Sequence, residues 1–482
     1  MTKNPSSALE AGFSRALVAE RTVADAPAGS APPKQALSGW GRLRVVEASV
    51  STPACLGDVT FPARRTVVCR GEGRSYGDAA VSANGTVLLT RELNALEHFD
   101  VTTGVLTAQA GLTIERLLDI VIPRGWFPPV TPGTKHVTLG GAVAADVHGK
   151  NHHRVGSLAS HIIEMDVMLA DGTTVTCGPQ QNAELFWATV GGMGLTGLIA
   201  RVTLQLAPIE TSGILAQYFR SPDLETTLTW LADSGHDDHY TVAWVDGLSR
   251  GRSLGRSVVM RGHHARRDEM PNPRLAVTAT TPLQVPFDFP SFVVNPLSVR
   301  AFNQLYYLVE GRKSRPFVVD YERFFYPLDR MADWNRLYGK RGFLQYQFML
   351  PDEGTAGVRV ILERISASRR PVFLGVMKRF GPGNPGPLSF PGQGFTLALD
   401  FPMTGPDVLR LLDQLDDLVI AYGGRVYLAK DARMSAERFR MMYPRLGEWL
   451  RCKEAVDPNG CFSSDLSRRL GLTVGAPALL TV

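Results

Sequence analysis

Three glycine-rich segments in the first 200 residues carry the clearest chemical signal of the sequence. They are GEGRSYGD at 71–78, the stretch from Pro132-Gly133-Thr134 to Thr138-Leu139-Gly140-Gly141, and GGMGLTG at 191–197. Glycine lets backbone N–H groups approach an anion closely, so such loops often bind phosphate. One loop of this kind is weak evidence, because tight turns also use glycine. Three of them favour a shared dinucleotide site.

The third segment contains a G-x-G-x-x-G pattern at Gly192, Gly194 and Gly197. In a Rossmann site a strand precedes this loop and a helix follows it, so that the helix N-terminus faces the pyrophosphate. Here a helix is predicted before the loop, over 182–190 with Asn182 as its cap, and an alternating strand pattern follows over 199–206. The order is reversed, which excludes a Rossmann site.

Candidate side chains for polar chemistry lie further along the chain. Gln345 and Gln347 alternate with apolar residues, so they share one face of a predicted strand, and buried amides on such a face need hydrogen-bond partners. His148, His152 and His153 have no carboxylate or cysteine at metal-ligand spacing, so no metal site is expected. From the residues alone, Lys430, two positions past a hydrophobic strand, is typical of a solvated strand end.

The elements that would position these residues follow from periodicity. Apolar residues spaced for one helix face predict helices over 114–122 and 408–419, and Asp171-Gly172 predicts the turn of a hairpin over 165–177. Strands and helices interleave, which indicates an α+β or α/β protein. The tract 282–296 is apolar but broken by four prolines, and it predicts a long hydrophobic loop.

Composition limits the class of protein. The 482 residues have a mean hydropathy of −0.03 and a net charge of +5, as expected of a globular protein without a nucleic-acid partner. The five cysteines form no C-x-x-C pair, which favours reduced thiols. No apolar run suits a membrane span or a signal peptide, so a soluble, cytoplasmic protein is expected. The Ala-, Ser- and Pro-rich residues 1–39 predict a disordered leader, with a weak helix over 8–20 as the alternative.

Seven blocks of the sequence resemble one enzyme family. They are GEGRSYGD (71–78), TPGTKHVTLGGAVAADVHGKNHH (131–153), ELFWATVGGMGLTG (184–197), FLQYQF (343–348), KRFGP (378–382), GGRVYLAKDAR (423–433) and SSDLSRRL (463–470). The chain resembles flavoproteins related to vanillyl-alcohol oxidase. Within them it is similar to the prenyl-phosphoryl-ribose 2′-oxidases, flavin subunits of epimerases that make the arabinose donor of actinobacterial cell walls.

The resemblance implies an α+β, two-domain fold with a substrate domain over the flavin. The FAD-binding domain would comprise residues 40–209 and 425–482, and the substrate domain residues 210–424. Many relatives attach FAD covalently through a histidine just before the serine of the first loop. This chain has Arg74 there, and it has no cysteine in 131–160. The expected cofactor is therefore FAD, bound non-covalently.

The resemblance also assigns site residues. Lys430 would be the catalytic base beside the flavin and the sugar hydroxyl, and His148 would lie in the same pocket. The residues implied for cofactor binding are Gly71, Gly73, Arg74, Ser75, Tyr76, Gly77, Asp78, Pro132, Gly133, Thr134, Thr138, Gly140, Gly141, Ala145, Gly149, Asn151, Gly194, Gly197, Ile199 and Tyr427. Those implied for the substrate pocket are Gln345, Gln347, Lys378, Phe380, Thr396, Ala398, Phe325 and Trp244.

The sequence departs from the family around the sugar. Thr396 and Ala398 stand where the family motif commonly has Asn and Cys, and Phe325-Tyr326 stands where mycobacterial members have Tyr-His. Two enzyme functions therefore remain: oxidation of a polyprenyl-phosphoryl-ribose, or oxidation of a soluble sugar, alditol or aminoglycoside-type intermediate. A flavin-binding scaffold without turnover is the third hypothesis. The family precedent adds an NADH-dependent keto-reductase partner.

A basic segment and the apolar loop suggest a further contact. Six arginines, Arg250, Arg252, Arg256, Arg261, Arg266 and Arg267, fall within 18 residues of sequence. Together with the loop at 282–296, they could meet a phosphate, a lipid tail or an anionic membrane surface. A solvated arginine-rich face beside a lid is the alternative interpretation.

Overall fold

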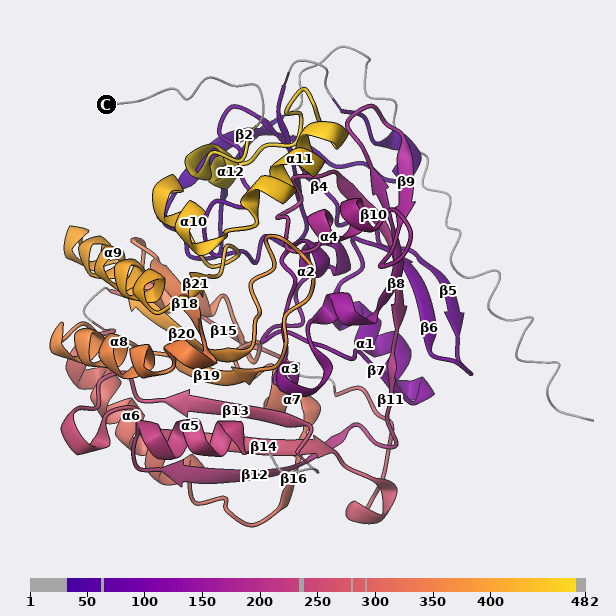
Figure 1. Ribbon diagram of the computed structural model, residues 1–482. Coiled ribbons are helices and arrows are strands. Elements are labelled where there is room, and N and C mark those ends of the chain that lie inside the picture. The colour runs from indigo at the N-terminus through magenta and orange to yellow at the C-terminus, as the bar shows by residue number, and fades with distance from the viewer. Residues whose placement is uncertain (1–32, 62–64, 234–237, 279–280, 291–292, 474–482) are drawn as a thin grey trace, which may run out of the picture.

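The computed structural model describes residues 33–61, 65–233, 238–278, 281–290 and 293–473 (Figure 1). Its largest sheet has eight strands and is antiparallel throughout. Their order is β16 (Phe317–Asp320), β12 (Gly213–Ser221), β14 (Ser257–His264), β13 (Tyr240–Val245), β19 (Gly375–Phe380), β20 (Gly394–Pro402), β18 (Phe343–Pro351) and β21 (Arg425–Val426).

Two smaller sheets come from the N-terminal part of the chain. One has the order β5 (Leu96–Asp100), β6 (Val105–Gln109), β10 (Leu198–Gln205), β8 (Ile162–Met168) and β9 (Thr174–Cys177). The other has the order β1 (Lys34–Ser38), β2 (Val45–Ser51), β4 (Thr86–Leu89) and β3 (Val67–Arg70). Two short pairs join β11 (Ala207–Pro208) to β7 (Trp126–Phe127) and β15 (Leu283–Gln284) to β17 (Met331–Ala332).

The helices cover these sheets. In the first half of the chain they are α1 (Ile114–Val121), α2 (Leu139–Ala144), α3 (His152–Val155), α4 (Ala183–Thr189), α5 (Leu224–Ala232) and α6 (Pro296–Glu310). In the second half they are α7 (Tyr321–Phe325), α8 (Ala356–Ala367), α9 (Pro406–Ala421), α10 (Ala436–Met442), α11 (Leu446–Val456) and α12 (Asp465–Leu470). Figure 1 shows α10, α11 and α12 beside the four-stranded sheet, so both ends of the described chain meet there.

The two faces of the eight-stranded sheet have different roles. Side chains alternate between faces along a strand, so one face carries Leu344, Tyr346 and Phe348 of β18. This face is buried in a core shared with α5, α8 and α9. The opposite face carries Gln345 and Gln347, and these side chains line a cavity.

Several predicted elements are confirmed. Helices form over Ile114–Val121 and Pro406–Ala421, the latter with Pro406 at its first position and its end before Gly423. β8 and β9 form the predicted hairpin. Helix α4 precedes the third glycine segment and strand β10 follows it, which confirms the reversed order that excluded a Rossmann site. Asn182 occupies the cap position but its amide donates to the Thr176 carbonyl instead.

The predicted leader over residues 1–39 is wrong at its end. Lys34–Ser38 forms strand β1, which pairs antiparallel with Val45–Ser49 of β2. Backbone hydrogen bonds to a neighbour stabilise an edge strand, and composition does not reveal them. The rest of the leader up to residue 32, with the weak helix over 8–20, lies outside the described residues.

Two other expectations need correction. The hydrophobic tract 282–296 contains a two-residue strand, β15, and its last residue, Pro296, begins α6. The strand expected before Lys430 ends at Val426, because the chain then turns, with Lys430 N–H donating to the Tyr427 carbonyl at 3.0 Å. Lys430 therefore lies in a turn and not two residues past a strand.

Candidate active site

A cavity of about 600 Å³ lies between the glycine-rich loops and the free face of the eight-stranded sheet. Most of the predicted site residues line it. They are Gly71, Gly73, Arg74, Ser75, Tyr76, Pro132, Gly133, Thr134, Thr138, Gly140, Gly141, Ala145, His148, Gly194, Gly197, Ile199, Trp244, Phe325, Gln345, Gln347, Lys378, Thr396, Ala398, Tyr427 and Lys430. The fold thus brings residues from nine separate stretches of the chain into one site.

Five predicted residues do not line this cavity. Gly77 packs against the Asp431 carbonyl, and Asp78 pairs with Arg469 at 2.8 Å. Gly149 packs against Asn151, whose amide donates to the Pro129 carbonyl at 2.9 Å. Phe380 packs behind the site, with its ring centroid 4.8 Å from that of His148. These residues support the cavity walls from outside.

The Lys430 amine is buried beside the cavity. Its Nζ lies 3.9 Å from the centroid of the Tyr76 ring. Burial, opposed by Asp400 and reinforced by Lys378, lowers the pKa of Lys430 to about 7. A neutral amine at this position can accept a proton near neutral pH, which a solvated lysine does not.

Two further lysines reach the same cavity. Burial lowers the pKa of Lys378 on β19 to about 8. Burial, with Lys378 as a secondary cause, lowers the pKa of Lys150 to about 7. Lys150 donates to the Phe324 carbonyl, and its Nζ lies 4.1 Å from the centroid of the Phe324 ring. Lys150 lies within the block 131–153 but carries no role implied by the family resemblance.

The Gln347 amide links His148 to the sheet. Its Nε2 donates to His148 Nε2 at 2.9 Å and to Thr396 Oγ1 at 3.2 Å. Burial, with Lys378, His152 and Lys430 as secondary causes, holds the pKa of His148 well below its usual value. The imidazole is therefore neutral, and its Nδ1 is a buried polar atom without a hydrogen-bond partner in the described chain.

A carboxylate missed in the sequence lies on the same sheet. Asp400 accepts hydrogen bonds from Gln345 Nε2 at 2.7 Å and from the Tyr338 hydroxyl at 3.1 Å. Burial raises the pKa of Asp400 to about 6. Asp400 lies two residues after Ala398 in the sequence, but nothing local to Tyr338 indicated its contact. Only the strand pairing of Gln345 with Asp400 brings the three together.

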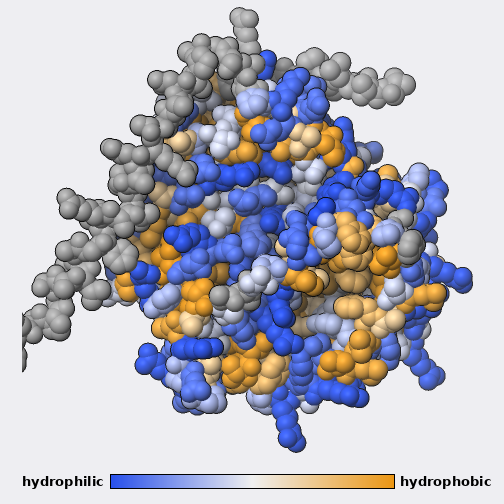
Figure 2. All heavy atoms as spheres, turned by 180° about the vertical axis from the view of Figure 1, so that it is seen from behind, coloured by the Kyte–Doolittle hydropathy of each residue, from blue (hydrophilic) through white to orange (hydrophobic). Residues whose placement is uncertain are grey.

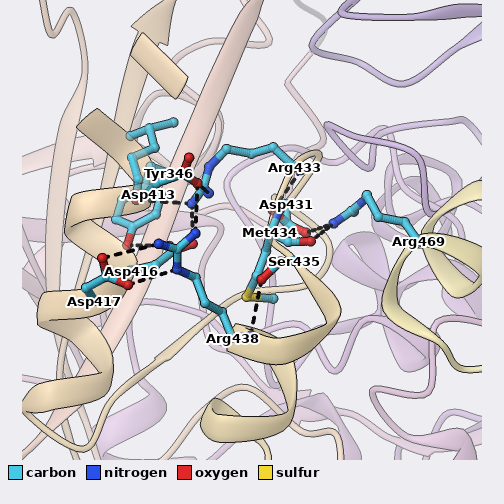
Figure 3. A network of polar contacts seen from close by, with 11 residues as sticks. Tyr346, Asp413, Asp416, Asp417, Asp431, Arg433, Met434, Ser435, Arg438 and Arg469 are labelled. Carbon is cyan, nitrogen blue, oxygen red and sulfur yellow. Dashed lines mark hydrogen bonds and ion pairs between the residues drawn. The ribbon is translucent and has the colours of Figure 1, made fainter. Parts of the chain in front are cut away.

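Ion pairs hold the turn that carries Lys430 (Figure 3). Asp431 pairs with Arg469 of α12 at 2.8 Å, and its other oxygen accepts from the backbone N–H groups of Arg433 and Met434. Arg433 pairs with Asp416 of α9 at 2.6 Å, and Asp416 also accepts from the Tyr346 hydroxyl of β18. The turn is therefore tied to helices on both sides and to the sheet.

The glycine loops fit a dinucleotide with a flavin ring. No acceptor within the described residues is found for the backbone N–H groups of residues 72–75 at the cavity wall. A side chain at Gly133 or Gly194 would point into empty space, and Gly194 has a φ of +72° that favours glycine. Arg74 Nε is buried without a partner in the described chain, with its guanidinium 4.1 Å above the Trp40 ring. Unpaired donors at an open cradle are what a pyrophosphate requires.

The described residues show no group of three or more His, Cys, Asp or Glu side chains that could hold a metal ion. The side chains that line the cavity include amines, amides and aromatic rings. This set can bind a sugar through hydrogen bonds and can move a proton through an amine.

Comparison with known proteins agrees with this geometry. Residues 62–178 match a family model described as FAD binding domain, and residues 399–470 match one described as D-arabinono-1,4-lactone oxidase. These matches cover the first two glycine segments and the Lys430 turn, respectively.

Full-length similarity is higher to individual proteins. The chain is 40% identical over 451 residues to the decaprenylphosphoryl-β-D-ribose oxidase of Mycolicibacterium smegmatis, covering 90% of this chain and 97% of that protein. It is 38% identical to an uncharacterized protein encoded in the mprA 5′ region of Streptomyces coelicolor, over 75% of this chain and all of that protein. Similarity to a putative D-arabinono-1,4-lactone oxidase of Neurospora crassa is 30% over 30% of this chain and 26% of that protein.

One assignment follows from three observations. They are the buried amine, the glycine loops with unpaired N–H donors, and the sequence identity over almost the whole length. The chain is an FAD-binding oxidoreductase and belongs to the family of the decaprenylphosphoryl-β-D-ribose oxidase.

Proposed function

We propose that the protein oxidises the 2′-hydroxyl of a polyprenyl-phosphoryl-ribose to the 2′-ketone, with FAD as its non-covalently bound cofactor. The observation that carries the proposal is the buried Lys430 amine, which faces the same cavity as the amides of Gln345 and Gln347. Oxidation of a secondary alcohol needs a base for the hydroxyl proton and an acceptor for the hydride. FAD, when bound, supplies the hydride acceptor.

The residues of the chain have separate tasks in this reaction. Lys430 Nζ accepts the hydroxyl proton, and its neutral form at neutral pH permits this. Gln345 and Gln347 orient the sugar through their amide groups, because Asp400, His148 and Thr396 fix those amides. The aromatic rings of Tyr427, Phe390 and Phe380 around His148 exclude water from this end of the cavity.

The domain division stays part of the proposal. We infer an FAD-binding unit of residues 40–209 and 425–482 and a substrate unit of residues 210–424. The separation of the eight-stranded sheet from the two N-terminal sheets supports it. Strand β21 pairs with β18, which would link the two units at residue 425.

A second candidate function is the oxidation of a soluble sugar, alditol or aminoglycoside-type intermediate. Thr396 and Ala398, which replace the common family residues, lie on β20 directly opposite Met349 and Gln347 and line the cavity. They change the polar part of the pocket and leave the glycine loops unchanged. Only these two replacements favour this candidate. The sequence identity to the decaprenylphosphoryl-β-D-ribose oxidase over almost the whole chain favours the lipid-linked substrate.

The 2′-ketone requires a second enzyme. Epimerisation is completed only when hydride returns to the opposite face of the sugar, so we propose an NADH-dependent keto-reductase as a partner. The proposal rests on the chemistry of the product, since a keto sugar is the oxidised half of the reaction.

We also propose contact with an anionic membrane surface through α6. Leu297, Phe302, Leu305, Leu308 and Val309 are large exposed apolar residues of this one helix. An open depression lined by Arg250, Arg256 and Arg300 lies beside it, with Ala301 and Gln304 of α6 in its wall. Figure 2 shows apolar side chains, in orange, grouped among charged ones on the face seen from behind. None of the helices in the described ranges is long and apolar enough to span a membrane.

The arginines expected to form one basic segment are mostly engaged within the protein. Arg256 pairs with Asp246 at 2.6 Å, Arg261 donates to the Asp233 carbonyl, and Arg266 pairs with Glu269 at 2.7 Å. Arg250 donates to the Ser366 carbonyl. The solvated, internally paired face is thus favoured over a free basic stripe.

The first prediction tests the substrate. Anaerobic mixing with a panel of prenyl-phosphoryl pentoses and free glycosides should bleach the flavin absorbance with the ribosyl lipid and leave it unchanged with free sugars. Bleaching by a free sugar, alditol or aminoglycoside alone would contradict the lipid-linked assignment and support the second candidate.

The second prediction concerns Lys430. Lys430→Ala should keep FAD and slow flavin reduction by about 10²–10⁴-fold, the usual contribution of a positioned base. Lys430→Arg should rescue little, because guanidinium stays protonated. In the native enzyme the reduction rate should rise with pH through about 7 and then level, because the amine becomes neutral there. Stopped-flow reduction at saturating substrate measures both effects.

Two variants should shift the midpoint of that pH profile in opposite directions. Lys378→Met removes a cation that lowers the pKa of Lys430, so the midpoint should move up. Asp400→Asn removes an anion that raises it, so the midpoint should move down. A rate independent of pH between about pH 6 and 9 would move the base role to the neutral His148 or to solvent.

The third prediction concerns cofactor attachment. Acid precipitation should release all the yellow colour into the supernatant, because Arg74 occupies the position of the covalent histidine and provides no imidazole nitrogen for the flavin. Colour retained by the precipitate, with a flavin adduct on a tryptic peptide, would refute non-covalent binding.

The fourth prediction concerns α6. The holoenzyme should sediment with phosphatidylglycerol vesicles and not with phosphatidylcholine vesicles, and Leu305→Glu should reduce that binding by about tenfold or more. Val45→Glu is the matched control, because Val45 is 69% exposed on the distant strand β2. If Leu305→Glu instead dissociates a dimer in analytical ultracentrifugation, α6 is an interface between copies and the membrane proposal fails.

A further inference from the structure

We propose that Arg469 of α12 is a positioning residue that couples the first glycine loop, residues 71–78, to the Lys430 turn, residues 427–434. It acts on the reaction only through Lys430, by holding the amine at a fixed place relative to the loop that is proposed to bind the cofactor. The inference rests on the proposed function, because it takes Lys430 as the base of that reaction.

The Arg469 side chain reaches both segments at once. Its Nε and Nη2 donate to the two carboxylate oxygens of Asp78, the last residue of the loop, at 2.9 and 2.8 Å. Its Nη1 donates to Asp431, the residue after Lys430, at 2.8 Å and to the Met434 carbonyl at 2.6 Å (Figure 3). Four hydrogen bonds from one planar group therefore fix the loop and the turn relative to each other.

The guanidinium compensates two carboxylates that water barely reaches. The side chain of Asp431 is 2% exposed and that of Asp78 is 9% exposed. Burial lowers the pKa of Arg469, but Asp431 and Asp78 outweigh burial and raise the pKa above its usual value. The guanidinium therefore stays charged, and its removal would leave both carboxylates with less compensation.

The loop and the turn also contact each other directly. The Tyr76 N–H donates to the Ala429 carbonyl at 3.0 Å, and the Lys430 amine lies over the Tyr76 ring. A Cβ at Gly77 would collide with the Asp431 carbonyl, so the two backbones approach as closely as glycine allows. Because the contact is close-packed, a shift of either segment displaces the other.

Helix α12 is itself anchored to the segment that follows the glycine loop. The Asp465 N–H donates to the Val81 carbonyl at 2.9 Å, and Asp465 Oδ1 accepts from the Ala83 N–H at 2.9 Å. The Arg469 side chain therefore extends from a helix that backbone hydrogen bonds hold in place.

The contacts of Arg469 separate the position of the Lys430 amine from its pKa. Arg469 is not among the residues that line the cavity, so it lies outside the space for the substrate. The pKa of Lys430 depends on burial, on Asp400 and on Lys378. Loss of Arg469 should therefore displace the amine without changing the pH at which it becomes neutral.

The pH profile of flavin reduction tests this separation. Arg469→Ala should retain FAD and lower the plateau rate at saturating substrate by about 10–10²-fold, because a displaced base transfers the proton poorly. The midpoint should remain at about pH 7. A plateau equal to that of the native enzyme would overturn the positioning role, whether or not the midpoint moves.

A double-mutant cycle tests whether Arg469 acts through Lys430. In the Lys430→Ala background, Arg469→Ala should cause no further loss of rate, because no amine is left to position. A full, multiplicative loss in that background would assign Arg469 a general structural role and overturn the proposal. Asp78→Asn removes the other end of the coupling and should slow reduction in the same way, which provides a second variant if Arg469→Ala fails to fold.

Chemical rescue tests the geometry of the guanidinium. The Arg469 side chain is 22% exposed, so its removal leaves a site that solvent can reach. Millimolar guanidinium should restore part of the rate of Arg469→Ala, and Arg469→Lys should rescue little, because one ammonium cannot bridge Asp78 and Asp431 as the planar fork does. Equal rescue by sodium chloride would assign the effect to ionic screening and contradict the proposal.

Arg468→Ala is the matched control on the same helix. The described hydrogen bonds of Arg468 go to Ser82, Ser463 and Asp465, and none of them reaches the Lys430 turn. This variant should reduce its flavin at the native rate. A loss equal to that of Arg469→Ala would show that any arginine of α12 has the same effect, and would overturn the specific role.

Hydrogen exchange of the FAD-loaded enzyme tests the coupling without a substrate. In Arg469→Ala and Asp78→Asn, the amides of residues 427–434 should exchange about tenfold faster, while those of β18 keep the native rate. If the turn exchanges faster but Lys430→Ala reduces its flavin at the native rate, the coupling stands and the base role in the proposed function fails. If Lys430→Ala is slow but exchange of the turn is unchanged in both variants, the base role stands and the coupling through Arg469 is overturned.

Discussion

The buried amine of Lys430 is the constraint on which the site depends. Taking an ammonium out of water is costly, and the protein meets that cost mainly by lowering the pKa of the amine instead of pairing it. The amine lies over the face of the Tyr76 ring, and Asp400 acts on it only through space. Because the amine is not held by a close ionic partner, its position depends on a rigid backbone. The pairs of Asp431 with Arg469 and of Arg433 with Asp416 supply one by fixing the turn to α12 and α9.

In the large sheet, one face provides stability and the other face carries the polar side chains of the site. Its one face is sealed by α5, α8 and α9 in a continuous apolar core, so the strands do not depend on their other face for stability. That free face can therefore carry Gln345, Gln347, Thr396 and Lys378, which would be costly in a core without partners. Each amide is anchored by a neighbour on the sheet or by His148, so the polar side chains are oriented before any ligand binds.

The sequence permitted prediction of local features and of recurrent motifs, but not of contacts made by tertiary pairing. Helices α1 and α9 and the β8–β9 hairpin have strong periodicity and turn signals, and all are present. Strand β1 was missed because its pairing with β2 is a tertiary contact that the composition of the leader does not reveal. Asp400 and Tyr338 were missed for a different reason, since their roles arise only when Gln345 is paired with Asp400 across the sheet. The glycine segments were found because close approach to an anion constrains residue type directly.

The hydrogen bonds around His148 favour Lys430 over His148 as the base of the proposed reaction. Gln347 Nε2 is a donor only, so His148 Nε2, 2.9 Å away, accepts from it and has no lone pair left for a substrate proton. In the neutral ring the proton then resides on Nδ1, a buried nitrogen that has no hydrogen-bond partner in the described chain. To act as a base it would have to break the Gln347 contact or become a buried cation beside Lys378 and Lys430, both of which oppose its protonation. Lys430 needs neither change, because its neutral amine presents an unshared pair. Within the proposed reaction, Lys430 is therefore the proton acceptor that this geometry favours, and His148 keeps its proton on Nδ1.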